Sequence, residues 1–75
     1  MMVKGVLEPT VEAGGWILKS EEGTYLLLGI AEYRTKEWFR EGARLRVWGK
    51  ESPDTVTTYM QGMPFSVSRM EPRED

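Results

Sequence analysis

The sequence contains neither cysteine nor histidine among its 75 residues. Their absence excludes disulfide bonds, a thiolate nucleophile, a histidine base and the Cys/His zinc sites that stabilise many small domains. A domain of this length buries only about 60% of its unfolded surface, so tight packing or oligomerisation has to supply its stability. We therefore expect no metal and no cofactor, and we expect oligomerisation to be a route to stability.

The sequence also lacks an excess of positive charge. It has 10 basic and 12 acidic residues, which gives a formal net charge of −2. Dedicated nucleic-acid-binding domains usually carry a basic excess, because neutralising phosphates supplies much of their affinity. The net charge therefore disfavours a nucleic-acid partner, although it leaves a local basic patch open.

Long apolar runs are missing as well. The start, MMVKGVLEP, contains no extended hydrophobic stretch, and no segment approaches the length needed to span a membrane. We expect a soluble, cytoplasmic protein that does not associate with membranes. The length predicts one domain over residues 1–75, with a core at about 2–70 and a loose tail at 71–75.

Catalytic groups are scarce in this composition. Glu12, Glu21, Glu22 and Asp54 fall in predicted loops or turns, without the spacing that would pair two carboxylates for acid–base catalysis. The Gly pair of AGG is followed by no helix that could bind a phosphate. We therefore expect no catalytic residues and interpret the protein as a non-enzyme.

What the sequence does contain is β-strand patterning. Gly23 stands in a turn between two strands, where a positive φ suits a short hairpin. In the last strand Phe65 and Val67, with Arg69 as a further member, share one side. Five strands are predicted, over residues 2–9, 16–20, 25–29, 43–51 and 64–70.

Residues 30–42 favour a short helix between the third and fourth strands. Thr35 can cap its start and Gly42 its end, so that one to two turns present Trp38 and Phe39. The connection at 52–63 has turn residues at Ser-Pro-Asp and at Gly62. It is either a binding element or a β-ribbon extension of its neighbouring strands.

This order of elements resembles the OB-fold, a five-stranded Greek-key barrel. The chain is similar to small bacterial OB-like domains with a YLLLG strand and a V-x-G strand before a long loop. The resemblance implies an all-β barrel with one short helix between strands three and four, whose Trp38 and Phe39 plug one barrel end. A β-sandwich fragment or an SH3-like barrel is the structural alternative.

The segment RLRVWGK, at residues 44–50, alternates between two faces. Leu45 and Val47 are suited to burial, while Arg44, Arg46, Trp48 and Lys50 form a basic face with an aromatic ring. That face is either a track for phosphates and bases or an ordinary solvated surface whose cations pair with Glu8, Glu41 or Glu51. We favour the solvated surface, because the OB resemblance implies a ligand surface on strands two and three.

In the third strand both faces are apolar, which is unexpected for a strand with one side in water. We expect the 52–63 loop, a second copy of the chain or a ligand to cover its outer side. The interface residues predicted on this basis are Leu26, Leu28, Met60 and Met63.

Two functions are compatible with these sequence features. The first is a small non-enzymatic binding module that associates with a protein partner or with a second copy of itself. The alternative is single-stranded nucleic-acid binding through strands two and three and the 52–63 loop, which Glu21 and Glu22 disfavour by repelling phosphate. The predicted ligand-binding residues are Trp16, Lys19, Tyr25, Tyr59, Arg44, Arg46 and Trp48.

Overall fold

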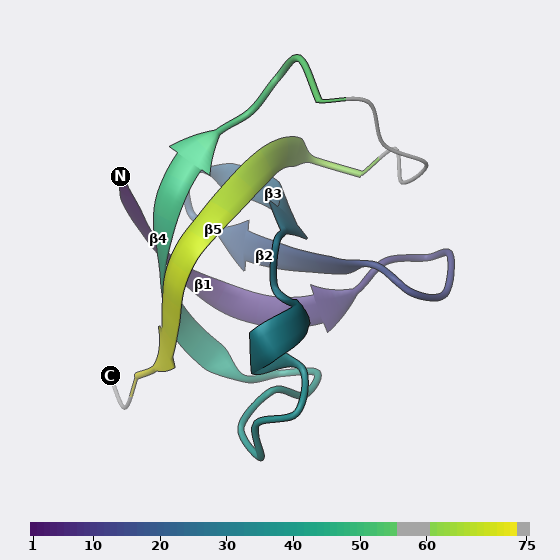
Figure 1. Ribbon diagram of the computed structural model, residues 1–75, viewed down its shortest axis with the longest axis vertical. Coiled ribbons are helices and arrows are strands. Elements are labelled where there is room, and N and C mark those ends of the chain that lie inside the picture. Colours follow the sequence, from purple (N-terminus) through teal and green to yellow (C-terminus); the bar gives the residue numbers. More distant parts are fainter. Residues whose placement is uncertain (56–60, 74–75) are drawn as a thin grey trace.

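A computed structural model describes residues 1–55 and 61–73 of the chain. The strands curve around one another into a barrel, with a short helical turn at one end (Figure 1). The elements are β1 (Met2–Pro9), β2 (Trp16–Ser20), β3 (Gly23–Leu28), the 3-10 turn η1 (Ala31–Tyr33), β4 (Arg44–Glu51) and β5 (Met63–Pro72).

The strands close into a barrel in the order β1-β2-β3-β5-β4. Strands β3 and β5 run parallel, and the β1–β2, β2–β3, β1–β4 and β4–β5 pairs are antiparallel. The closed all-β barrel confirms the predicted fold class, and its topology is compatible with an OB-like fold.

Alternation along the strands fills the barrel with apolar side chains. Leu7, Leu18 and Tyr25 lie in one register row of β1, β2 and β3, and all three belong to the core. On β4, Leu45 and Val47 are fully buried, as the RLRVWGK pattern predicts. The core cluster comprises Val3, Leu7, Leu18, Tyr25, Leu27, Ile30, Leu45, Val47, Phe65 and Met70.

The β2–β3 hairpin is confirmed with a tighter turn than the sequence indicates. Ser20 pairs directly with Gly23, so β3 begins two residues earlier than predicted and ends at Leu28. Gly23 has a φ of 138°, a backbone conformation that side chains disfavour. The side chain of Ser20 closes the turn by donating a hydrogen bond to the carbonyl of Gly23 at 2.8 Å.

A register shift between Trp48 and Gly49 alters the alternation of β5. Trp48 pairs with Arg69 and Gly49 pairs with Val67, which leaves Ser68 as an extra residue on β5. The prediction that Arg69 shares a side with Phe65 and Val67 is therefore wrong, because the bulge turns Arg69 outward and Met70 into the core.

Gly49 is required by the close approach of the two strands at this bulge. A Cβ atom at residue 49 would lie 2.0 Å from the carbonyl oxygen of Ser66 and 2.8 Å from the ring of Phe65. Neither the β5 backbone nor a fully buried ring can move aside at low cost, so a side chain here would force the strands apart.

The helix between β3 and β4 is present as the single 3-10 turn η1, earlier in the chain than predicted. The predicted start at Thr35 is wrong, because residues after η1 form successive turns. These turns are closed by backbone hydrogen bonds between residues close in sequence. One of them runs from the Phe39 N–H to the Lys36 carbonyl at 3.1 Å. Trp38 and Phe39 are half-buried and pack against the core cluster, as the plug role requires.

The ends of β5 also differ from the sequence prediction. Residues 71 and 72, predicted as part of a loose tail, belong to β5 and pair with Arg46 and Leu45. The N–H of Arg73 continues the ladder with a 2.8 Å hydrogen bond to the Arg44 carbonyl. The core prediction of 2–70 is therefore short by these residues, while 74–75 lie outside the described part of the chain.

Candidate functional site

The outer side of β4 gathers the cations that the sequence predicts on one face. Arg44 and Lys50 are exposed, and Arg46 and Trp48 are half-buried. Because β4 lies between β1 and β5 in the barrel, its outer side chains meet neighbours from both strands.

Strand register adds two further cations to this face. Lys4 of β1 lies opposite Arg46, and Arg69 of β5 lies opposite Trp48. Arg46 also lies opposite Glu71 of β5, so a carboxylate stands on the side of Arg46 away from Lys4. We use the name cationic face for Lys4, Arg44, Arg46, Lys50 and Arg69, with Trp48 among them.

Arg69 covers the aromatic ring of this face. Its guanidinium carbon lies 5.0 Å from the centre of the Trp48 ring, a cation–π contact. The same guanidinium forms an ion pair with Glu71 at 2.8 Å. The ion pair and the cation–π contact together hold Arg69 in place over the indole. Of the carboxylates expected to balance the β4 cations, Glu8 pairs with Lys19 of β2.

A groove of about 490 Å³ opens beside Trp48. Its lining includes Gly49 and Lys50 from β4, and Ser66 and Ser68 from β5. The hydroxyl of Ser68 donates to the Trp48 carbonyl at 3.1 Å. The groove therefore combines an indole, an ammonium group and two hydroxyls at the bulge.

A second groove, of about 350 Å³, has mixed charge. It is lined by Lys4 and Arg73, by the carboxylates of Glu21 and Glu22, and by Met2. The two carboxylates line this groove together with Lys4, at the β1 edge of the cationic face.

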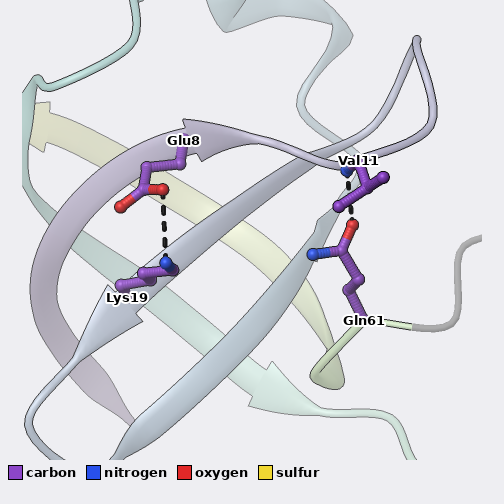
Figure 2. Close-up of polar contacts among 4 residues, drawn as sticks. All are labelled: Glu8, Val11, Lys19 and Gln61. Carbon is purple, nitrogen blue, oxygen red and sulfur yellow. Dashed lines mark hydrogen bonds and ion pairs between the residues drawn. The ribbon is translucent and has the colours of Figure 1, made fainter.

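The surface predicted on strands two and three is less suited to a ligand. Trp16 is half-buried and makes an edge-to-face contact with Phe39, with ring centres 4.9 Å apart. Lys19 is 3.3 Å from the carboxylate of Glu8 (Figure 2). These two side chains serve the barrel end and an exposed ion pair, and do not converge on a shared site.

Tyr25 lies inside the barrel. Only 6% of the residue is exposed, and its ring packs edge-to-face against Phe65 at 5.3 Å. Burial raises the pKa of the Tyr25 phenol above its ordinary value, and the carboxylates of Glu22 and Glu51 raise it further. A buried phenol offers no face for a base to stack on, so the structure does not support Tyr25 as a binding residue.

The outer side of β3 is already covered within a single chain. Ile17 and Leu26 face each other across β2 and β3, on the side opposite the core pair Leu18 and Tyr25. They are nevertheless only 2% and 1% exposed. Leu26 therefore presents no surface to a second copy in this conformation.

The β1–β2 loop and the segment before β5 meet in one hydrogen bond. The backbone N–H of Val11 donates to the side-chain oxygen of Gln61 at 2.6 Å, across 50 residues of sequence (Figure 2). Pro64 lies beside Leu26 in the β3–β5 register. Because Leu26 is only 1% exposed in a single chain, the chain itself covers this part of β3.

The other predicted interface residues are Leu28, Met60 and Met63. Leu28 is half-buried at the end of β3, and Met63 is half-buried and packs against the core. Met60 lies outside the described residues, and so do the predicted ligand-binding residue Tyr59 and the middle of the 52–63 connection.

Sequence reasoning missed Lys4, Arg69, Ser66 and Ser68 as members of the site. Lys4 and Arg69 are 65 residues apart in sequence, and the pairing of β4 with both β1 and β5 brings them to one face. A signal existed in the alternation of Lys4 with buried Val3 and Gly5, which marks Lys4 as outward-facing.

Within residues 1–55 and 61–73, no group of three or more acidic residues could hold a metal ion. In the same residues, no helix has the length and apolar character to cross a membrane. Comparison with protein-family models, curated proteins and solved structures finds no match to this chain.

Proposed function

We propose that this barrel is a non-enzymatic binding module and that it binds single-stranded nucleic acid through the cationic face. The observation that carries the proposal is the convergence of Lys4, Arg44, Arg46, Lys50 and Arg69 on the outer side of β1, β4 and β5. The formal net charge is −2, so this concentration of positive charge is a local feature of the fold.

The chemistry of the face favours a single strand over a duplex. Proteins that bind single strands combine a positive surface that follows the backbone with aromatic rings that stack on bases. Bases also stack on arginine guanidinium planes, and Arg69 presents one above Trp48. A strand surface of this kind offers no helix or ribbon to enter the major groove of a duplex.

Association with a protein partner or a second copy is the competing proposal. It relied on the outer side of β3, where Leu26 is buried by the chain itself, and on the 52–63 loop, whose middle lies outside the described residues. Of the predicted interface residues on β3, only Leu28 keeps part of its surface exposed. This area is small beside the roughly 800 Å² per partner that a stable interface buries.

The proposal is tested by fluorescence anisotropy of labelled single-stranded DNA and RNA at low and moderate salt. We expect the binding constant to fall steeply with salt. The slope of its logarithm against the logarithm of the salt concentration should be about −0.7 for each phosphate contacted. The double variant Arg44→Ala and Arg46→Ala should bind more weakly and with a shallower slope. The control, Arg34→Ala with Lys36→Ala, removes two exposed cations from the β3–β4 connection and should bind like the wild type.

Absence of binding at high micromolar protein in low salt would reject nucleic-acid binding. Equal losses in the Arg44/Arg46 variant and in the Arg34/Lys36 control would place the contact elsewhere on the barrel. If no binding is seen, a dimer in sizing experiments would move the conclusion to protein association.

A further inference from the structure

We propose that the groove at the β4–β5 bulge holds one unstacked base of the bound strand. This inference rests on the proposed function and assigns a specific contact within it. The groove is open to solvent next to the cationic face, and its volume of about 490 Å³ falls within the usual range of ligand pockets.

The bulge produces this groove. The extra residue Ser68 interrupts the β4–β5 ladder where Trp48 gives way to Gly49. The strand bends at such a point, and its side chains are re-aimed. As a result, Arg69 is directed over the indole while Ser66 and Ser68 line the opening beside it.

The groups around the groove match the parts of a nucleotide. The indole of Trp48, with the Arg69 guanidinium 5.0 Å from its centre, offers π surface on which a base can stack. Lys50 is exposed at the rim, where its ammonium group can meet a phosphate. The hydroxyls of Ser66 and Ser68 can accept or donate hydrogen bonds to a base edge.

Ser66 and Ser68 already form hydrogen bonds within the protein, but they can form further ones. Ser66 shares a 2.6 Å hydrogen bond with Ser52, and Ser68 donates to the Trp48 carbonyl. Each hydroxyl oxygen has two lone pairs, so Ser68 still accepts while it donates. The groove therefore has polar capacity to recognise a base as well as apolar surface to stack it.

The test compares two strands of equal length and equal phosphate number, one intact and one with abasic sites throughout. Anisotropy titrations are run with the wild type, Trp48→Leu and Trp48→Phe, after thermal melts show which variants fold. We expect the wild type to bind the intact strand at least about tenfold more tightly than the abasic strand. Trp48→Leu should reduce this ratio to about threefold or less, and Trp48→Phe should keep most of it.

The outcomes separate this inference from the proposed function. If the wild type binds both strands equally, and Arg44→Ala with Arg46→Ala weakens both, the base pocket is rejected while the cationic face stands. A preference for the intact strand that survives in Trp48→Leu also rejects the pocket at this position. If neither strand binds, both proposals fail.

Discussion

At the scale of single residues, Tyr25 has the most unusual environment among the predicted binding residues. Its phenol is buried beside Phe65, and the carboxylates of Glu22 and Glu51 act on it. Both burial and negative charge oppose ionisation of the phenol, so its pKa is raised in the folded protein. Tyr25 thus contributes to the free energy of unfolding, and this contribution depends on pH in the alkaline range.

The raised pKa of Tyr25 predicts a loss of stability at high pH. The folded protein keeps the phenolic proton to a higher pH than the unfolded chain, in which the pKa of tyrosine is about 10. The contribution is fully present below that pH and declines as pH rises from the unfolded pKa toward the folded pKa. Urea denaturation between pH 8 and 11 should show a steeper decline for the wild type than for Tyr25→Phe.

Tyr25→Phe is a close control, since it removes the titrating hydroxyl and keeps the ring against Phe65. Tyr33, which is half-buried on η1, supplies a comparison in Tyr33→Phe. Identical pH dependence of unfolding in the wild type and Tyr25→Phe would contradict the assignment.

At the scale of secondary-structure elements, β3 is buried on both sides although it belongs to a barrel with one core. Leu27 belongs to the core cluster, and Leu26 points to the opposite side of the strand, where the chain also buries it. We expect Leu26→Ala to lower the free energy of unfolding by about 2–4 kcal/mol, because it empties a fully buried position. Leu28→Ala should cost about 1 kcal/mol, because Leu28 is half-buried. Denaturant titrations measure both values.

A protein that used the outer side of β3 as its interface would behave differently. Leu26→Ala would then change the oligomeric state in light scattering, and the two substitutions would have similar effects on unfolding of the monomer. Concentration-dependent unfolding of the wild type would point the same way.

The positions of the strands could be predicted from the sequence because each strand carries its own local signals. Pro9 ends β1, the glycine at residue 23 marks the hairpin, and the alternation in RLRVWGK separates buried from outer side chains. The helix could not be placed in this way. Trp38 and Phe39 would point about 100° apart on an α-helix, yet both pack against the same core. Successive turns allow this, and no helix begins at Thr35.

Only part of the cationic face could be predicted from the sequence, because its β1 and β5 residues join it only through strand pairing. The cations of β4 stand together in the sequence, but Lys4 and Arg69 join them only through the β1–β4 and β4–β5 registers. Gly49 inside the predicted fourth strand is a signal for a bulge or a close approach of two strands, but it does not tell which residue of β5 is the extra one. That residue is Ser68, and its insertion decides that Arg69 faces outward. Burial of Tyr25 and Leu26 likewise depends on the closed barrel and its loops.

At the scale of the whole molecule, charge is distributed unevenly over the barrel. The sequence pI is about 5.1, and the net charge at pH 7 is −2. The cationic face nevertheless groups five of the ten basic residues on three adjacent strands. Polyanions are attracted by the local potential of a face more than by the net charge, especially where salt screens the distant carboxylates.

This asymmetry predicts that a protein with an acidic pI is retained on a sulfonate cation exchanger at pH 7 and low salt. The charge-reversed variants Arg44→Glu with Arg46→Glu, and Arg34→Glu with Lys36→Glu, form a matched pair. Each substitution changes the charge by −2, so both variants go from −2 to −6. We expect the first to flow through and the second to be retained at slightly lower salt, because only the first removes charge from the cationic face. Equal elution of the two variants would show that net charge alone governs retention, and the cationic face would then not act as a unit.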